Sequence, residues 1–201
     1  ELRLLLGTQM IAKGLDFPNV RLVGVINADT ALGLPDFRAS ERTFQLVSQV
    51  AGRAGRGSMV GRVVVQTLDP SQPAIRFAAE HDYVGFATEE LEVRREAGFP
   101  PAVRMARIVC RDPDLGKAQA AADSLAATLR RAIEERPGSG VRLMGPMPCP
   151  IARIAGQHRL EIELTAPGRG VLQDVLRAVR AAGLVKSDAK TAVDVDPIAI
   201  V

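Results

Sequence analysis

Hydrophobic and polar residues change their spacing repeatedly along the first half of the chain. Apolar residues three or four positions apart predict helices at 39–49 and over most of 71–97. Short apolar runs at 1–6, 21–28 and 62–67 predict strands. The run at 1–6 is expected to be only the end of a strand. Strands that alternate with helices favour a parallel sheet, so the expected fold class is α/β.

A glycine and two prolines interrupt this pattern at 98–101 (GFPP). Proline has no backbone N–H and cannot continue a helix, so the segment ends the preceding helix. We expect a domain junction here, which divides the chain into domains at 1–99 and 100–201.

The second half has its own order of elements. Strands are expected at 103–110, 141–144, 159–164 and 192–200, and helices at 114–135 and 170–182. The first helix has one apolar face, formed by Leu115, Ala118, Ala122, Leu125, Leu129 and Ala132. A segment with three prolines, 145–150, is expected to separate the second and third strands. The order β-α-β-β-α-β predicts a small α+β domain of the split βαβ type.

Composition narrows the class of protein. The chain has 201 residues, 47% of them hydrophobic and 24% charged, which is typical of globular domains and excludes a disordered tail, collagen or a coiled coil. There is no bilayer-length apolar run and no basic-then-apolar leader, so neither a transmembrane segment nor a secretory signal is expected. Cys110 and Cys149 are too few for a disulfide framework or a four-cysteine zinc site. We predict two core thiols, no metal site and a cytoplasmic protein.

Basic residues are mostly arginine. The formal net charge is +3, and 22 of the 26 basic residues are arginine. Because the planar guanidinium group suits phosphate contacts, nucleic acid is a natural partner. A genome rich in arginine codons explains the same composition, so this alternative stays open. Aromatic residues make up 3% of the chain and there is no tryptophan, so no base-stacking platform is visible.

The segment 49–56 (QVAGRAGR) is the strongest candidate for chemistry. Its glycines allow the backbone to approach a ligand closely. Arg53 and Arg56 supply donors for a triphosphate and for the charge that develops as its terminal phosphoryl group leaves. The alternative is a solvated arginine-glycine loop.

A second candidate follows the first strand at 7–18 (GTQMIAKGLDFP). Thr8 and Lys13 suit a phosphate, Gly14 relieves backbone crowding, and Asp16 suits a ribose hydroxyl or an arginine. A plain strand and turn is the alternative.

The two segments together resemble motifs V and VI of the superfamily two helicases. In that family both motifs lie on the second RecA-like lobe, and motif VI reaches across a cleft to a nucleotide held by the first lobe. The resemblance implies catalytic roles for Gln49, Arg53 and Arg56, with Arg56 as the arginine finger. It also implies DNA contacts from Thr8 and Lys13. Contacts to ATP with Mg²⁺, shared with the first lobe, are implied for Gly14, Asp16 and Gly52.

Three further segments narrow the resemblance. They are 29–42 (DTALGLPDFRASER), 145–150 (GPMPCP) and 193–197 (VDVDP). With the motifs above, they are similar to the family of replication restart helicases, called PriA or primosomal protein N′. The likeness covers essentially the whole chain.

This resemblance implies a function. Family members bind branched and single-stranded DNA, unwind it 3′ to 5′ with ATP, and assemble the primosome with other proteins. They also bind the tail of single-stranded DNA-binding protein, a role that falls here on Arg153 and Arg159. The family's zinc clusters and phosphate-binding loop lie upstream of residue 1, so we expect that this chain alone does not hydrolyse ATP. Two alternatives stay open: a non-catalytic, fork-binding scaffold and another repair translocase of superfamily two.

One strand carries a possible DNA-binding stripe. Arg104 and Arg107 lie in the strand expected at 103–110 and Arg111 directly follows it, and we expect the three arginines to share one face. Arg104 and Arg107 are the candidates for phosphate contacts, which would make binding sensitive to salt. A solvated strand face is the alternative. For the loop at 36–42, a surface facing DNA or ATP and an internal ion-pair turn are equally favoured.

Overall fold

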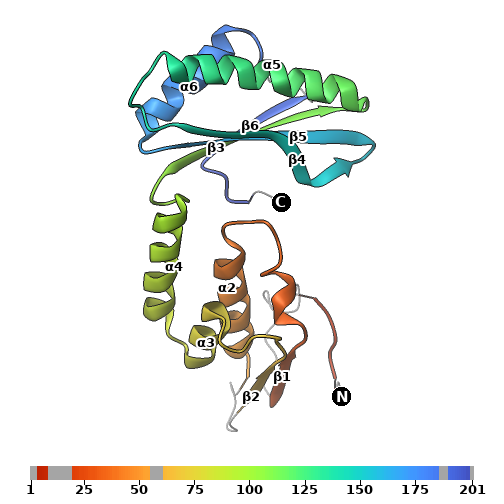
Figure 1. Ribbon diagram of the computed structural model, residues 1–201. Coiled ribbons are helices and arrows are strands. Elements are labelled where there is room, and N and C mark those ends of the chain that lie inside the picture. The colour runs from red at the N-terminus through yellow and green to blue at the C-terminus, as the bar shows by residue number, and fades with distance from the viewer. Residues whose placement is uncertain (1–3, 9–19, 55–60, 186–189, 200–201) are drawn as a thin grey trace. The chain divides into compact units, whose positions relative to one another are not determined.

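The computed structural model describes residues 4–8, 20–54, 61–185 and 190–199. It divides into two compact units, Glu1–Glu90 and Leu91–Val201, which we describe separately (Figure 1). The division falls within helix α4 (Tyr83–Ala97), whereas the glycine-proline pattern places the junction at 98–101. No helix among the described residues is long and apolar enough to cross a membrane.

The first unit contains a two-stranded parallel sheet. Strands β1 (Leu22–Val25) and β2 (Arg62–Val65) pair in register, with Leu22 opposite Arg62. A short 3-10 helix, η1 (Ala28–Thr30), follows β1. The predicted strands at 21–28 and 62–67 are confirmed. Residues 4–8, which include part of the strand expected at 1–6, lie outside any strand because no described strand pairs with them.

Three helices build the core of the first unit: α2 (Ala39–Ala51), α3 (Pro73–Glu80) and α4. The rings of Phe44 and Phe86 stack with centroids 4.3 Å apart, and Phe77 meets Phe86 edge to face at 6.5 Å. The helical structure expected over most of 71–97 is confirmed, and it is divided into α3 and α4 because His81 adopts a left-handed conformation (φ 56°) that ends α3. Asp82 then accepts a hydrogen bond from the N–H of Gly85 at 2.8 Å, and α4 begins.

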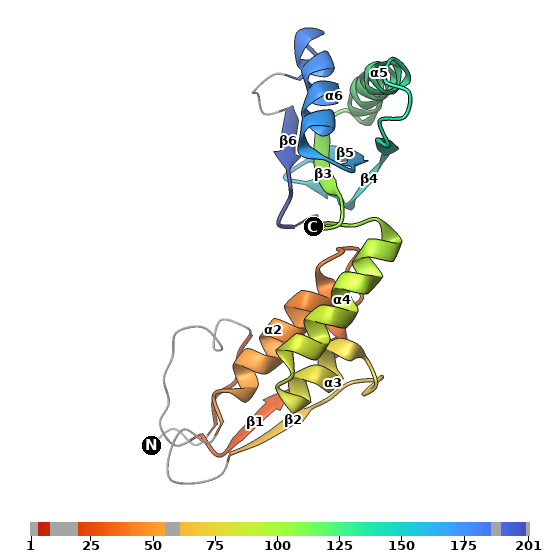
Figure 2. The ribbon, with the colours of Figure 1, turned by 90° about the vertical axis from the view of Figure 1, so that its left-hand side faces the viewer.

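The second unit is a four-stranded antiparallel sheet with two helices. In chain order its elements are β3 (Arg104–Asp112), α5 (Leu115–Glu134), β4 (Arg142–Ile154), β5 (Gln157–Ala166), α6 (Arg169–Ala181) and β6 (Thr191–Val195). The strands lie in the order β4-β5-β3-β6, and every neighbouring pair is antiparallel. This is the split βαβ arrangement that the order of elements predicts. Helices α5 and α6 cover one face of the sheet (Figure 2).

The core of the second unit lies between that face and the helices. Asp114 begins α5 by accepting a hydrogen bond from the N–H of Lys117 at 3.0 Å. Five of the six apolar residues predicted to face inward are buried. Leu115 is instead 53% exposed, because it is the first residue of the helix and lies at the rim of the core. Leu129, Ile162 and Leu164 are completely buried in this layer.

Strand β4 differs from its prediction. The proline segment does not separate two strands, because β4 runs through it without interruption to Ile154. β4 is an edge strand, where the missing N–H of a proline on the free side costs no ladder hydrogen bond. Its pairing with β5 shifts register between Met144 and Met147 and again between Pro148 and Arg153. Gly145 has φ 94°, and a Cβ there would meet the carbonyl oxygen of Glu161 at 2.6 Å, so glycine is required at the first shift.

Candidate functional site

The end of helix α2 brings three predicted site residues together. Gln49 lies exposed in the last turn, and Gly52 is the exposed residue that caps the helix. The chain continues in hydrogen-bonded turns, with the N–H of Arg53 donating to the carbonyl of Val50 at 3.0 Å. Arg53 is partly exposed, and its positive charge is favoured near the negative end of the helix dipole. The side chains of Gln49 and Arg53, the two motif VI residues that the structure describes, are therefore accessible at one end of the helix.

The other motif residues are less completely described. Thr8 is exposed. The predicted site residues Lys13, Gly14, Asp16 and Arg56 lie outside the described residues. Of the residues predicted for motifs V and VI, the structure therefore describes four: Thr8, Gln49, Gly52 and Arg53.

The loop before α2 is an ion-pair turn. Asp36 is buried, accepts the N–H of Arg38 at 2.9 Å and pairs with Arg42 Nη1 at 2.9 Å. Arg38 also donates to both carboxylate oxygens of Glu41, at 3.0 and 2.6 Å, which raises the pKa of Arg38. Of the two interpretations of this loop, the geometry favours the internal ion-pair turn.

Asp29 joins the carboxyl ends of the two parallel strands, a role that the sequence analysis missed. Its carboxylate accepts the hydroxyl of Thr67 at 2.7 Å and the N–H of Leu68 at 2.8 Å. These two hydrogen bonds lower the pKa of Asp29. The partners are separated by 38 and 39 residues, so no local pattern signals the contact.

We expect Asp29→Asn to lower the melting temperature of the first unit at pH 7 and to have a smaller effect in acid. The pKa of Asp29 is lower in the folded protein, so its contribution to stability is present above about pH 4, the usual carboxyl range. It is lost as the pH falls through the folded value. Thermal unfolding at several pH values measures the difference, with the exposed Asp123→Asn as control. An equal loss at pH 7 and at the acid limit would contradict it.

The expectation that the arginines of β3 share one face is wrong for Arg104. Arg104 and Arg107 are three positions apart and point to opposite faces of the sheet, whereas Arg107 and Arg111, four apart, share a face. Arg104 is exposed, and its Nη1 lies 3.2 Å from a carboxylate oxygen of Asp196, just after β6. Arg107 is buried: its Nε and Nη2 lie 2.7 and 2.5 Å from Glu161 Oε2 on β5. A DNA phosphate would have to displace Glu161 to reach Arg107, whereas the Arg104 guanidinium is accessible at the surface.

Two glutamates of β5 share the face that carries Arg107. Glu161 and Glu163 are 4% and 8% exposed. Burial, and secondarily the negative charge of Glu161, raises the pKa of Glu163. No local pattern signals the contact between Glu161 and Arg107, because the two residues are 54 positions apart in the chain. The position of Arg107 along β3 shows which face of the sheet it is on, but it does not show which residue of the neighbouring strand lies beside it.

Both cysteines are buried, as predicted for core thiols. Burial raises the pKa of Cys110 to about 11. Burial and the negative charge of Glu161 raise the pKa of Cys149 to about 11. Both thiols are protonated at neutral pH and are therefore poor metal ligands.

The residues predicted to bind an acidic protein tail lie near the turn between β4 and β5. Arg153 is exposed near the end of β4. Arg159 on β5 is half-buried and donates from Nη1 to the carbonyl of Ile151 at 3.1 Å. Glu161 is two residues further along β5, so basic and acidic groups lie close together here.

Comparisons with known proteins agree over most of the chain. Residues 95–198 match the family described as Primosomal protein N C-terminal domain. The replication restart protein PriA of Bacillus subtilis is 46% identical over 158 residues, covering 79% of this chain and 19% of that protein. The proteins of that name from Treponema pallidum and Haemophilus influenzae are each 42% identical, over 198 and 200 residues. They are covered to 30% and 26%, so the chain spans less than a third of their length.

Proposed function

The chain belongs to the PriA family of replication restart proteins, and from this premise we propose that it is the C-terminal part of an ATP-dependent DNA helicase acting at branched DNA in the cytoplasm. The observation that carries this proposal is the likeness over 98% of the chain at 42% identity. The intact protein would unwind DNA 3′ to 5′ and assemble the primosome.

In this proposal the first domain, 1–99, is the later part of a second RecA-like lobe. Its support is the parallel pairing of β1 and β2 with the crossover helix α2 between them, which is a βαβ unit. Such units build the parallel sheets of α/β domains. The second domain, 100–201, would supply DNA-binding surface.

The exposed end of α2 fits a contact with the terminal phosphate of ATP. Gln49, Arg53 and Arg56 would approach that phosphate, while Gly14, Asp16 and Gly52 would lie nearer the rest of the nucleotide. When bound, Mg²⁺ with ATP neutralises phosphate charge during phosphoryl transfer. The arginines orient the terminal phosphate and stabilise the charge that develops on it. Zinc does not fit the two cysteines of this chain, because Cys110 and Cys149 are both buried and protonated at neutral pH.

DNA binding in this proposal rests on Thr8, Lys13 and Arg104, with Arg107 accessible only if its ion pair opens. The purified chain is expected to bind a three-way DNA junction more tightly than a linear duplex of the same length. It is expected to show no DNA-stimulated ATP hydrolysis. Fluorescence anisotropy and a phosphate-release assay measure the two properties. Equal affinity for junction and duplex, or measurable turnover, would contradict the proposal.

The tail of single-stranded DNA-binding protein is the second candidate partner, at Arg153 and Arg159. The exposure of Arg153 favours it, because an acidic tail needs accessible cations. The negative charges of Glu161 and Glu163 on the same strand oppose it. A labelled acidic tail peptide, titrated with the Arg153→Gln protein, tests it: loss of peptide affinity supports this partner, and unchanged affinity excludes Arg153 from the contact.

A further inference from the structure

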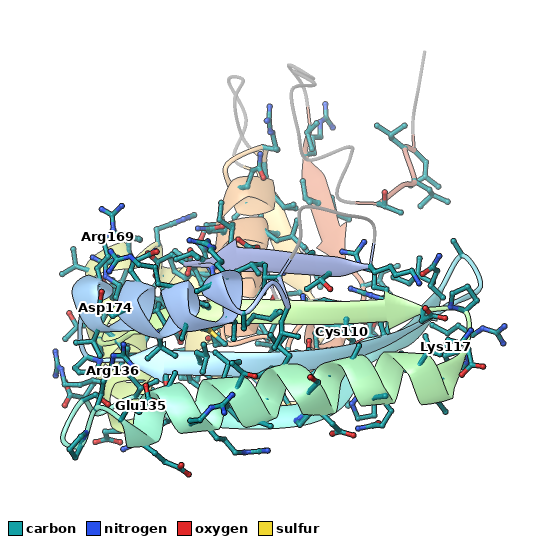
Figure 3. All side chains as sticks on the ribbon, turned by 90° about the horizontal axis from the view of Figure 1, so that it is seen from above. Cys110, Lys117, Glu135, Arg136, Arg169 and Asp174 are labelled. Atoms are coloured by element: carbon teal, nitrogen blue, oxygen red, sulfur yellow. The ribbon has the colours of Figure 1, made fainter. Side chains whose placement is uncertain are left out.

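Two arginines lie next to each other on neighbouring strands, at the end of the sheet where β3 stops and the β4–β5 hairpin turns. Arg111 on β3 lies directly opposite Arg159 on antiparallel β5. Directly opposite residues point to the same face, with Cβ atoms about 4.5–5.5 Å apart. Figure 3 shows this end of the sheet, near the labelled Lys117 at the start of α5. Two arginine side chains therefore leave the sheet side by side on one face.

No described carboxylate pairs with either arginine. The nearest acid on their face is Glu161, one pair further along, and Arg107 already binds it. Asp112 points to the other face and pairs with Lys190 Nζ at 3.0 Å. Arg111 Nε is buried and has no hydrogen-bond partner among the described residues. Because like charges opposite each other are unfavourable, an anion between them would stabilise the pair.

The hairpin beside this pair ends in an apolar, basic tip. Ile151 and Ile154 are 47% and 46% exposed. Ala155 and Gly156 form the tight turn with φ 49° and 80°. The segment 142–160 contains no aspartate or glutamate. In Figure 1 the end of β4 bends away from α5 and α6, which leaves the tip clear of the helices.

We propose that this hairpin end binds DNA at a branch, where Arg111 and Arg159 hold one backbone phosphate and Ile151 and Ile154 lie against the adjacent unstacked base. The inference rests on the proposed function, since it assumes that the protein binds branched DNA. Guanidinium pairs bind phosphate through several fixed donors. Apolar side chains insert where base steps are unstacked, and a branch offers both features at one place.

The phosphate contact is tested by Arg111→Gln in the intact protein. Fork affinity is measured by fluorescence anisotropy at several salt concentrations. Losing one phosphate contact lowers the slope of log affinity against log salt by about one. The melting temperature is expected to stay the same or rise, because the repulsion between the two arginines is removed. A merely structural arginine would lower the melting temperature and leave the slope unchanged.

The apolar contact is tested by the double variant Ile151→Thr/Ile154→Thr, which keeps β-branched residues in the strand. A 2-aminopurine base at the branch reports unstacking. We expect its fluorescence rise to be lost and the preference for fork over duplex to fall about tenfold, as when a side chain that stacks on a base is removed. Met144→Thr is the matched control, because Met144 lies on the same strand and is 57% exposed. Arg177→Gln, on α6, is the control for charge.

Each outcome has one meaning. If the unchanged protein shows no preference for forks, the proposed function fails and this inference fails with it. If it prefers forks and the Arg111 and isoleucine variants keep that preference and the salt slope, only this inference is overturned. It is also overturned if the isoleucine variant loses an acidic tail peptide while fork binding is unchanged, because the tip would then bind protein.

Discussion

Arg56→Ala in the intact protein is expected to slow DNA-stimulated ATP hydrolysis about 10³-fold or more. An arginine finger stabilises the negative charge that spreads over the terminal phosphoryl group in the transition state, and its loss has effects of this size. The prediction rests on the spacing of 49–56 and on the described position of Gln49 and Arg53 at the exposed end of α2. Steady-state phosphate release with saturating single-stranded DNA measures it.

The controls separate the finger from general effects of charge. Arg95→Ala removes an exposed arginine that pairs with Glu92 on α4 and is expected to leave turnover unchanged. Arg56→Lys keeps the charge without the planar fork of donors, so an intermediate rate is expected. Wild-type rates in Arg56→Ala would exclude the finger. No hydrolysis by the unchanged intact protein, with fork binding retained, would favour the non-catalytic scaffold instead.

Glu161→Gln is expected to destabilise the second unit by about 3 kcal/mol. The Arg107 and Glu161 side chains are 9% and 4% exposed, so the substitution leaves a buried guanidinium without a counter-charge. Replacing both residues, as Arg107→Met with Glu161→Met, is expected to recover most of the loss, because no buried charge then remains. Urea unfolding measures the free energy of unfolding, and hydrogen exchange of the β3 and β5 amides reports the stability of this sheet.

The exposed pair of Arg177 and Asp174 is the matched comparison. Their side chains are 74% and 48% exposed, and such pairs contribute about 0–1 kcal/mol. Arg177→Met should therefore change the free energy of unfolding little. If Glu161→Gln were equally mild, Arg107 would be solvated in practice, and a phosphate contact from it would become credible again.

Local periodicity predicted most elements of the fold. Helices α2, α5 and α6 and strands β1, β2, β3 and β5 lie close to their expected positions, because the spacing of apolar residues is a property of the nearest ten or twenty residues. The details that the periodicity did not give also have local causes. The break at His81 depends on one left-handed residue, and the continuation of β4 through its prolines depends on its being an edge strand.

In the candidate site, too, some features follow from the sequence and others depend on the tertiary structure. The sequence by itself determined the family, the order of elements in the second unit, and the motif VI residues near the end of a helix, since each depends on residues close together in the chain. Only the tertiary structure decided that Arg107 is neutralised by Glu161, that Arg111 faces Arg159, and that Asp29 ties β1 to β2. These contacts depend on the register between strands 38 to 54 residues apart. A strand's own alternation shows which residues share a face, but only packing with its neighbours shows which charges meet there.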